Sequence, residues 1–296
     1  MTDPDDRTQY IGGSDLAPIL GVSPYATALD VYLRKTGEAP EQEMSEPMRW
    51  GTLLEPVILA RYAEATGIDV TPGVYMYDDS RHWLRGHLDG LAPDRVVEVK
   101  ATRSAQDWGE PGTDQIPIYY VPQVQLYMYL AHRTMADVPV LIGGSDFRVY
   151  TVARDDALIG GILGRAAAFW HEHILARVPP APVNLADVRA LFKRDSGIVQ
   201  IASPDVVAAA QALASVKAVI RRSESEAERL EFVLQSAMRD AAELVTDSGD
   251  LLATWKTTKP SRRFDASAFK AAHPDLHARY SVESTSRRFL LKLKEE

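Results

Sequence analysis

The chain has 296 residues, 46% of them hydrophobic and 25% charged, so it is long enough to form one large domain or a domain with an appendage. It contains no cysteine, which excludes disulfides, thiolate zinc sites, iron–sulfur clusters and a cysteine nucleophile, so any bound metal would need oxygen or imidazole ligands. The N-terminus is acidic and polar, and no segment approaches the roughly 18 consecutive apolar residues of a membrane span, so we expect a cytoplasmic protein.

The net charge of −8 argues only superficially against a nucleic-acid partner, because the charge is unevenly distributed. Residues 249–296 contain ten Lys and Arg against six Asp and Glu, and carboxylates gathered around metal ions would inflate the acidic count elsewhere. We expect the basic side chains of this segment either to contact DNA or a partner or to form an ordinary solvated surface. They are Lys256, Lys259, Arg262, Arg263, Arg287 and Arg288.

A short helix is predicted near the N-terminus, where a Gly-Gly turn leads into an apolar segment that ends at Gly21. Ser14 or Asp15 would cap this helix. Backbone N–H groups at a helix N-terminus and a free hydroxyl can hold a phosphate, and Arg7 lies near enough in the sequence to add charge. The alternative is a plain capped helix. A second helix is expected to open at residues 23–25.

A longer helix is predicted over residues 48–66, with Gly67 as its stop. Its apolar face would consist of Leu53, Leu54, Val57, Ile58 and Tyr62. Glu55 falls among these residues, so its carboxylate should point at least partly inward. A buried carboxylate needs a cation or hydrogen-bond donors, whereas the alternative is a glutamate at the boundary of an amphipathic helix.

Alternating strands are predicted over residues 70–77 and 82–88, and they lead into the run Val96-Val97-Glu98-Val99-Lys100. In a strand with this alternation Glu98 and Lys100 share one face. If Asp89 ends one strand and Pro93-Asp94 turns the chain, the hairpin brings Asp89 across from Glu98, where two carboxylates can share a divalent cation. The alternative is an ordinary charge pair on a sheet surface. Histidines near a sheet edge are more often structural, as expected for His82, and only His87 is considered as a neighbour of this site.

The next segment is predicted to alternate loops, helices and strands. Residues 101–112 would form a loop at the substrate entrance, and residues 117–135 a helix that carries Gln123. Residues 138–143 and 147–153 are expected to form a hairpin, followed by a helix over 155–177. The prolines at 179, 180 and 182 would end this unit.

Forty residues without Pro or Gly follow Ser203-Pro204, with apolar residues spaced mostly by three or four. One helix of this length would span about 60 Å, too long for the core of an ordinary domain. It is therefore a projecting arm, an oligomer contact or two helices broken near residues 223–225. The tail is predicted to contain a strand over 251–257, a helix over 266–272 and a strand over 286–293, which together form a small α+β appendage.

Five ordered motifs in residues 7–175 resemble the lambda-exonuclease-like, YqaJ-type viral recombinase family, a branch of the PD-(D/E)xK nucleases. They are I-G-G-S-D followed by L-G-V-S-P-Y, R-W-G-T-L-L-E-P, R-G-H-L-D-G-L, V-E-V-K and P-Q-V-Q-L-Y. Leu88-Asp89 replaces the Pro-Asp of the superfamily name, a departure that is common in this branch.

The resemblance implies a role for each matching residue. Glu55, Asp89, Glu98 and Val99 would be metal ligands, and Lys100 the catalytic lysine. Gln123 and Tyr127 match a Q-x-x-x-Y helix motif in which Gln orients the site. Arg7 and Ser14 would bind the 5′ phosphate of a DNA end.

The implied fold is an α/β, restriction-endonuclease-like core, with a central mixed sheet of four or five strands flanked by helices. The nuclease domain would cover residues 1–200, and residues 201–296 would form a helical arm and a small basic α+β tail. The implied activity is Mg²⁺-dependent digestion of double-stranded DNA from 5′ ends, with two ions per site that Mn²⁺ can replace. Relatives expose 3′ strands for an annealing protein and assemble as rings, so we expect a trimer or tetramer.

Two other functions fit the same residues. A nuclease of this fold could cut internally or act only on single strands, and a non-catalytic scaffold could bind DNA ends during recombination. The intact set of Glu55, Asp89, Glu98, Lys100 and Gln123 argues against the scaffold. Among carboxylates and metal ions, Lys100 could act as a base or as an electrostatic stabiliser.

Overall fold

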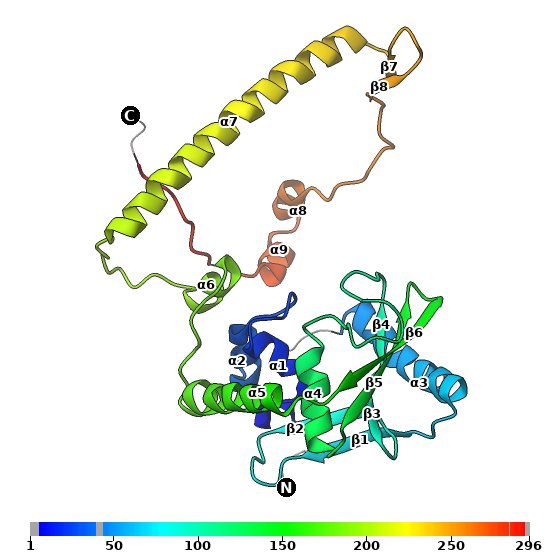
Figure 1. Ribbon diagram of the computed structural model, residues 1–296. Coiled ribbons are helices and arrows are strands. Elements are labelled where there is room, and N and C mark those ends of the chain that lie inside the picture. Colours follow the sequence, from blue (N-terminus) through cyan, green and yellow to red (C-terminus); the bar gives the residue numbers. More distant parts are fainter. Residues whose placement is uncertain (1–5, 40–43, 284, 294–296) are drawn as a thin grey trace. The chain divides into compact units, whose positions relative to one another are not determined.

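The computed structural model describes residues 6–39, 44–283 and 285–293, and the chain divides into two units, Met1–Leu191 and Phe192–Glu296 (Figure 1). A mixed sheet organises the first unit. Its strand order is β1-β2-β3-β5-β4, and β6 pairs with β5. The strands are β1 Thr71–Tyr77, β2 Arg85–Leu91, β3 Arg95–Val97, β4 Lys100–Thr102, β5 Met135–Ile142 and β6 Asp146–Ala153.

The pairing of β5 makes the sheet mixed. β5 runs parallel to β3 and β4 and antiparallel to β6, while β1, β2 and β3 form an antiparallel meander. The parallel crossover from β4 to β5 contains α4 (Val121–Leu130), as parallel connections require. The predicted α/β class with a central mixed sheet flanked by helices is confirmed, although the sheet has six strands rather than four or five.

Consecutive residues of β3 separate the two faces of the sheet, because side chains alternate along a strand. Val96 packs in a cluster with apolar residues of α4, including Val124, whereas Val97 packs with Ile58 and Tyr62 of α3 (Glu46–Thr66). The cluster on the α4 side also includes residues of α1 (Gly13–Ile19), α2 (Ala28–Thr36) and α5 (Asp156–Phe169). Helices therefore cover both faces (Figure 1).

Short helical elements complete the first unit. A 3₁₀ turn, η1 (Arg7–Gln9), precedes α1, and a π-helical segment, η2 (Trp170–Leu175), extends α5 within the predicted helix over 155–177. α6 (Leu185–Leu191) was not expected from the sequence. No helix in the described ranges is both long enough and apolar enough to cross a bilayer.

Three helix predictions in this unit were wrong in detail. α2 starts at Ala28 rather than at residues 23–25, because Thr27 caps it while the Ser23 hydroxyl accepts the N–H groups of Tyr25 and Ala26. The helix expected over 117–135 ends at Leu130, since Met135 already pairs in β5. Leu53 and Val57 are exposed rather than buried, because α3 touches the sheet through Ile58, Leu59 and Tyr62.

The second unit contains one long helix, α7 (Pro204–Met238), with no break near residue 223. A hairpin of β7 (Glu243–Val245) and β8 (Leu251–Thr254) follows, then α8 (Ala266–Ala272) and α9 (Pro274–Tyr280). α7 ends at Met238, so the last of the forty residues without Pro or Gly lie outside the helix, and Leu244 lies in β7. The strand expected over 286–293 is not formed, because no other strand pairs with these residues in the described chain.

Candidate active site

Asp89 and Glu98 lie opposite each other at the open end of the β2–β3 ladder. The last paired residues are Gly90 and Val97, so the next residues outward are Asp89 and Glu98. Asp89 Oδ2 accepts a hydrogen bond from the Val99 N–H at 2.8 Å. The predicted strand over 96–100 is consequently interrupted, with β3 ending at Val97 and β4 starting at Lys100. Burial raises the pKa of Asp89, and the Lys100 ammonium and the Val99 N–H offset this effect only in part.

Glu98 is almost fully buried, with 1% of its surface exposed. Its Oε1 atom accepts a hydrogen bond from Lys100 Nζ at 2.5 Å, so the two side chains meet as predicted although the strand between them is interrupted. Its Oε2 atom is buried and has no hydrogen-bond partner among the described residues. Burial raises the pKa of Glu98 to about 8, and the charges of Asp89 and Glu55 add to the shift. A buried acceptor without a partner lowers the stability of the fold by about 1–3 kcal/mol. A cation bound to this oxygen would remove that cost.

Lys100 connects Glu98 to the helix on the same side of the sheet. Burial alone would lower the pKa of Lys100, but the charges of Glu98 and Asp89 outweigh burial and raise it, so the ammonium remains charged. Lys100 Nζ also donates to Gln123 Oε1 at 3.2 Å, and Gln123 Nε2 donates to the Tyr127 hydroxyl at 3.2 Å. Burial raises the pKa of Tyr127 as well, which keeps its hydroxyl protonated.

Sequence reasoning missed Tyr120, whose ring centroid lies 4.7 Å from Lys100 Nζ. A cation above an aromatic face is attracted by the negative potential of the ring, so Tyr120 helps to hold the ammonium in place. Tyr120 lies three residues before Gln123, and residues three apart share one face of a helix. This spacing is the signal that could have identified Tyr120.

Glu55 is half-buried on α3, and the structure brings it into electrostatic reach of Asp89. Burial raises the pKa of Glu55, and the negative charge of Asp89 raises it further. Val99, the remaining predicted ligand, can offer a metal only its backbone carbonyl, because its side chain is a hydrocarbon.

In the part of the chain that the structure describes, no three His, Cys, Asp or Glu side chains converge closely enough to form a complete metal site. The donor set nevertheless fits a hard divalent cation. It offers only oxygen atoms, which suit Mg²⁺ and Mn²⁺ better than Zn²⁺. A cation would also satisfy Glu98 Oε2 and offset the burial that raises the pKa of Glu98.

Arg7 and Ser14 form a hydrogen-bonded pair at the N-terminus of α1. Arg7 Nη2 donates to Ser14 Oγ at 2.8 Å, and both side chains are exposed. The helix starts at Gly13 and is capped differently from the prediction, since Asp15 accepts the Gly12 N–H through Oδ2 at 3.0 Å and Ser14 is left inside the first turn. Ser14 is therefore not used as a cap, and its hydroxyl is oriented by Arg7.

A buried ion pair fixes the backbone that carries Arg7. Lys35 Nζ lies 2.7 Å from Asp15 Oδ2 and donates to the Arg7 carbonyl oxygen at 2.6 Å. Burial opposes ionisation of Asp15, but the Lys35 ammonium outweighs it and lowers the pKa of Asp15. Sequence analysis missed Lys35, because a lysine in an amphipathic helix normally faces solvent.

One cavity of about 370 Å³ joins these two groups of residues. Asp89 and Gln123 lie on its wall together with Arg7 and Ser14. Its other lining residues are Tyr10, Gly12, Gly13, Tyr75, His87 and Tyr127. Gly13 permits this arrangement, since a Cβ atom there would lie 2.7 Å from the Tyr127 ring and 2.8 Å from Gln123 Cγ. The residues expected to bind a DNA end thus share a cavity with Asp89, one of the predicted metal ligands.

Strand pairing explains why the cavity opens at this point. The Arg85 N–H donates to the Ile11 carbonyl oxygen at 3.0 Å, and the Ile11 N–H donates to Trp83 O at 2.7 Å. β1 occupies the other edge of β2, so residues 86–89 lie between the N-terminal segment and β3. The Asp89 backbone therefore lies within β2, while its side chain borders a cavity.

The predicted C-terminal contacts belong to the second unit. Lys256 pairs with Glu243 across the β7–β8 hairpin, with Nζ and Oε1 2.5 Å apart. Arg287 Nη1 donates to the Phe192 carbonyl oxygen at 3.2 Å. Lys259, Arg262, Arg263 and Arg288 are exposed. His82, expected to be structural, is exposed, as is His87.

Comparisons with known proteins agree with the motifs. The model of the YqaJ-like viral recombinase domain matches residues 4–134. The Bacillus subtilis (strain 168) protein called Uncharacterized protein YqaJ is 30% identical over 298 residues, which cover 97% of this chain and 92% of that protein.

Solved structures of exonucleases are similar at lower identity. The alkaline exonuclease LHK-Exo from Laribacter hongkongensis is 23% identical, with a TM-score of 0.48, over 58% of this chain and 90% of its own. A phage related exonuclease from Haemophilus somnus 129PT is 14% identical, with a TM-score of 0.43, over 57% of this chain and 96% of its own. On the evidence of the domain match and of the identity that extends over nearly the whole chain, the protein belongs to the YqaJ-like viral recombinase family.

Proposed function

We propose that the protein is a metal-dependent deoxyribonuclease that digests double-stranded DNA from 5′ ends and exposes 3′ single strands for recombination by annealing. The observation that carries this proposal is the shared cavity, in which the Arg7–Ser14 pair and Asp89 line one space. A 5′ phosphate bound by a guanidinium and a helix N-terminus would place the following phosphodiester towards the carboxylates. The names of the similar exonucleases are consistent with the proposal.

The chain's own residues would divide the chemistry between them. Glu55, Asp89 and Glu98, with the Val99 carbonyl, would hold two Mg²⁺ ions, which Mn²⁺ can replace. When bound, these ions polarise the scissile phosphate and stabilise the leaving 3′ oxygen. Lys100 is held by Glu98 and Gln123, so its ammonium can orient the attacking water or stabilise developing charge. Tyr127 holds Gln123 in turn.

The decisive experiment compares linear and covalently closed circular DNA in Mg²⁺ and in EDTA. Loss of a 5′ label from linear DNA alone, and only in Mg²⁺, supports a 5′ exonuclease. Cleavage of the circle would favour an endonuclease, and digestion of single strands alone would favour a single-strand-specific nuclease. End binding without cleavage in Mg²⁺ or Mn²⁺ would favour a non-catalytic scaffold.

We also propose that the protein acts as a homo-oligomer together with a single-strand annealing protein. α7 supports the oligomer, because its apolar residues recur at the first and fourth positions of consecutive heptads. These residues are Val206, Leu213, Ile220, Ala227 and Leu234 at the first position and Ala209, Val216, Leu230 and Ala237 at the fourth, where Ser223 interrupts the series.

The basic residues of the second unit are proposed to contact DNA or the partner. A truncation after Gln200 tests this role through the salt dependence of DNA binding, since each lost phosphate contact makes the negative slope of log K against log salt less steep by about 0.9. An unchanged slope and an unchanged oligomeric state would show that the tail does not bind DNA.

A further inference from the structure

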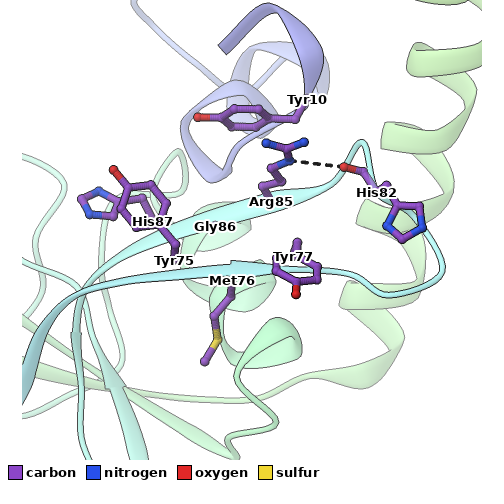
Figure 2. A pocket seen from close by; sticks show the side chains of 8 residues that line it. All are labelled: Tyr10, Tyr75, Met76, Tyr77, His82, Arg85, Gly86 and His87. Atoms are coloured by element: carbon purple, nitrogen blue, oxygen red, sulfur yellow. Dashed lines mark hydrogen bonds between the residues drawn. The ribbon is translucent and has the colours of Figure 1, made fainter. Parts of the chain in front are cut away.

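A second cavity of about 460 Å³ lies beside the one that contains Asp89 (Figure 2). We call it the aromatic pocket. It is lined by Tyr10, Tyr75, Met76, Tyr77, His82, Arg85, Gly86 and His87. None of these residues is acidic, although the chain as a whole carries a net charge of −8. The pocket is therefore a site where an anionic ligand with an apolar face would meet no local repulsion.

The strand register of β1 and β2 builds the pocket. Tyr75 pairs with His87 and Tyr77 pairs with Arg85 across the two strands. The rings of Tyr75 and His87 lie 4.3 Å apart between centroids, with an angle of 31° between their planes. Tyr75 and Tyr77 expose 60% and 64% of their surfaces, so two aromatic side chains face an open cavity rather than the core.

Arg85 closes the pocket on the side of the N-terminal segment. Its guanidinium lies 4.9 Å from the centroid of the Tyr10 ring, and its Nε donates to the His82 carbonyl oxygen at 3.3 Å. Figure 2 shows Arg85 beside the Tyr10 ring, with this hydrogen bond drawn as a dashed line. No carboxylate pairs with Arg85 within the described chain. The planar guanidinium is thus fixed by a ring and a carbonyl while its positive charge remains available to a ligand.

The aromatic pocket continues into the cavity of the candidate active site. Tyr10, Tyr75 and His87 line both. Along β2, Arg85, His87 and Asp89 alternate with buried residues, so they follow one another at steps of two residues, about 7 Å each. A ligand that extends from Asp89 along this strand would reach the aromatic pocket within one or two steps.

We propose that the aromatic pocket holds an unpaired nucleobase of the DNA strand end that enters the candidate active site. This proposal rests on the proposed function. Every base has a π-face, so stacking on tyrosine and histidine rings binds a base without regard to sequence, and Arg85 adds a cation for the base face or the neighbouring phosphate. The pocket would hold the terminal nucleotides apart from their complement and so keep the scissile phosphate near Asp89.

Tyr77 is the best residue to test, because it lines the aromatic pocket but not the cavity around Asp89. Binding should be measured by fluorescence anisotropy in EDTA, where the DNA is not cut, with a 5′-phosphorylated duplex that has two unpaired nucleotides at its 5′ end. Tyr77→Ala should weaken binding about 5- to 100-fold. Tyr77→Phe keeps the ring and should bind within about twofold of the wild type. Tyr280→Ala, at a tyrosine 74% exposed in the second unit, is the matched control.

A second DNA whose two unpaired nucleotides are abasic shows whether the ring contacts a base. The wild type should bind the abasic end more weakly than the complete end, and this difference should be several-fold smaller in Tyr77→Ala. If the wild type and Tyr77→Ala lost affinity by the same factor when the bases were removed, the proposal would be overturned. Binding of the complete end by Tyr77→Ala as tightly as by the wild type would overturn it too. Equal affinity of the wild type for a cross-linked blunt duplex would also overturn it, since the pocket would then contact paired DNA.

The same proteins separate this proposal from the proposed nuclease activity. If the wild type binds base-dependently through Tyr77 but never cleaves DNA in Mg²⁺ or Mn²⁺, the nuclease proposal fails and the pocket stands. If the wild type cleaves and Tyr77→Ala binds normally, the pocket fails and the nuclease stands.

Discussion

Glu98 and Lys100 form an ion pair in which only one carboxylate oxygen is used, while the second oxygen is buried without a partner. The Glu98 carboxyl, whose pKa is raised, and the Lys100 ammonium meet in a region from which water is largely excluded. This arrangement is costly for stability and suits a site that must accept a cation.

The first prediction concerns the chemical step. Asp89→Ala, Glu98→Gln and Lys100→Ala should each reduce Mg²⁺-dependent cleavage at least about 100-fold, because ligands and lysine act as one unit. Thermal unfolding in EDTA should show that Glu98→Gln remains folded, since glutamine keeps an acceptor for Lys100. Turnover near the wild-type rate in any of these variants would remove that residue from the site.

The second prediction links metal binding to pH. The pKa of Glu98 is raised to about 8 by burial, so below this pH the metal-free protein holds a proton that a cation must displace. Mg²⁺ affinity should therefore rise with pH between about 6 and 8, by at most about tenfold per unit, and level off above pH 8. Calorimetry in two buffers of different ionisation enthalpy measures the released proton. Glu98→Gln should lose this release, and a pH-independent affinity in the wild type would contradict the assignment.

The third prediction concerns recognition of the DNA end. Arg7→Ala removes a guanidinium that lies 2.8 Å from Ser14 Oγ, so it should slow digestion of 5′-phosphorylated DNA much more than that of 5′-hydroxyl DNA. Arg165→Ala, at an exposed arginine of α5, is the control. Equal losses on both substrates would make Arg7 a general backbone contact.

The residues of the candidate site could be predicted from the sequence, whereas Lys35, which holds the backbone of the DNA-end site, could not. Asp89, Glu98, Lys100 and Gln123 lie together because strand alternation, one hairpin and one helix are enough to bring them close, and each leaves a local pattern. Lys35 leaves no such pattern, since its burial depends on how α2 packs beside α1, and Lys35 lies twenty positions after Asp15 in the sequence.

Element boundaries failed where tertiary contacts override local preference. The helix pattern over 117–135 continues to Met135, yet pairing with β3 and β6 makes Met135 a strand residue. Leu53 and Val57 fit an apolar helical stripe, but the sheet reaches α3 only near Ile58 and Tyr62. The periodicity of a sequence shows which residues form an apolar helical face, but only the packed structure shows which of them are buried against another element.

The fourth prediction tests the support beneath the DNA-end site. Lys35→Met leaves Asp15 buried without its ammonium partner, so it should lower the free energy of unfolding by about 3–5 kcal/mol. It should also reduce the preference for 5′ phosphates, because the Arg7 carbonyl loses its donor. Arg34→Met is the matched control, since Arg34 is partly exposed and lies 3.6 Å from Asp15. Urea unfolding and the two-substrate assay measure these effects, and equal outcomes for both variants would contradict a special role for Lys35.

The fifth prediction concerns the heptad positions of α7. Val206, Val216 and Ile220 are exposed along this 35-residue helix, and a helix so long gains little stability from its own backbone. Left-handed coiled coils bury such a repeat against another helix with the same period, and a second copy of α7 provides one.

A charge in the middle of the repeat should therefore disrupt the assembly. Ile220→Asp should raise the dissociation constant of the oligomer at least about 100-fold, because a buried carboxylate would replace a central apolar contact. Phe232→Asp is the matched control, since Phe232 is 71% exposed but lies outside the first and fourth heptad positions. Sedimentation velocity across a concentration series measures both. If the two substitutions weaken assembly equally, or neither does, the subunits associate through another surface and the apolar repeat of α7 serves a different partner.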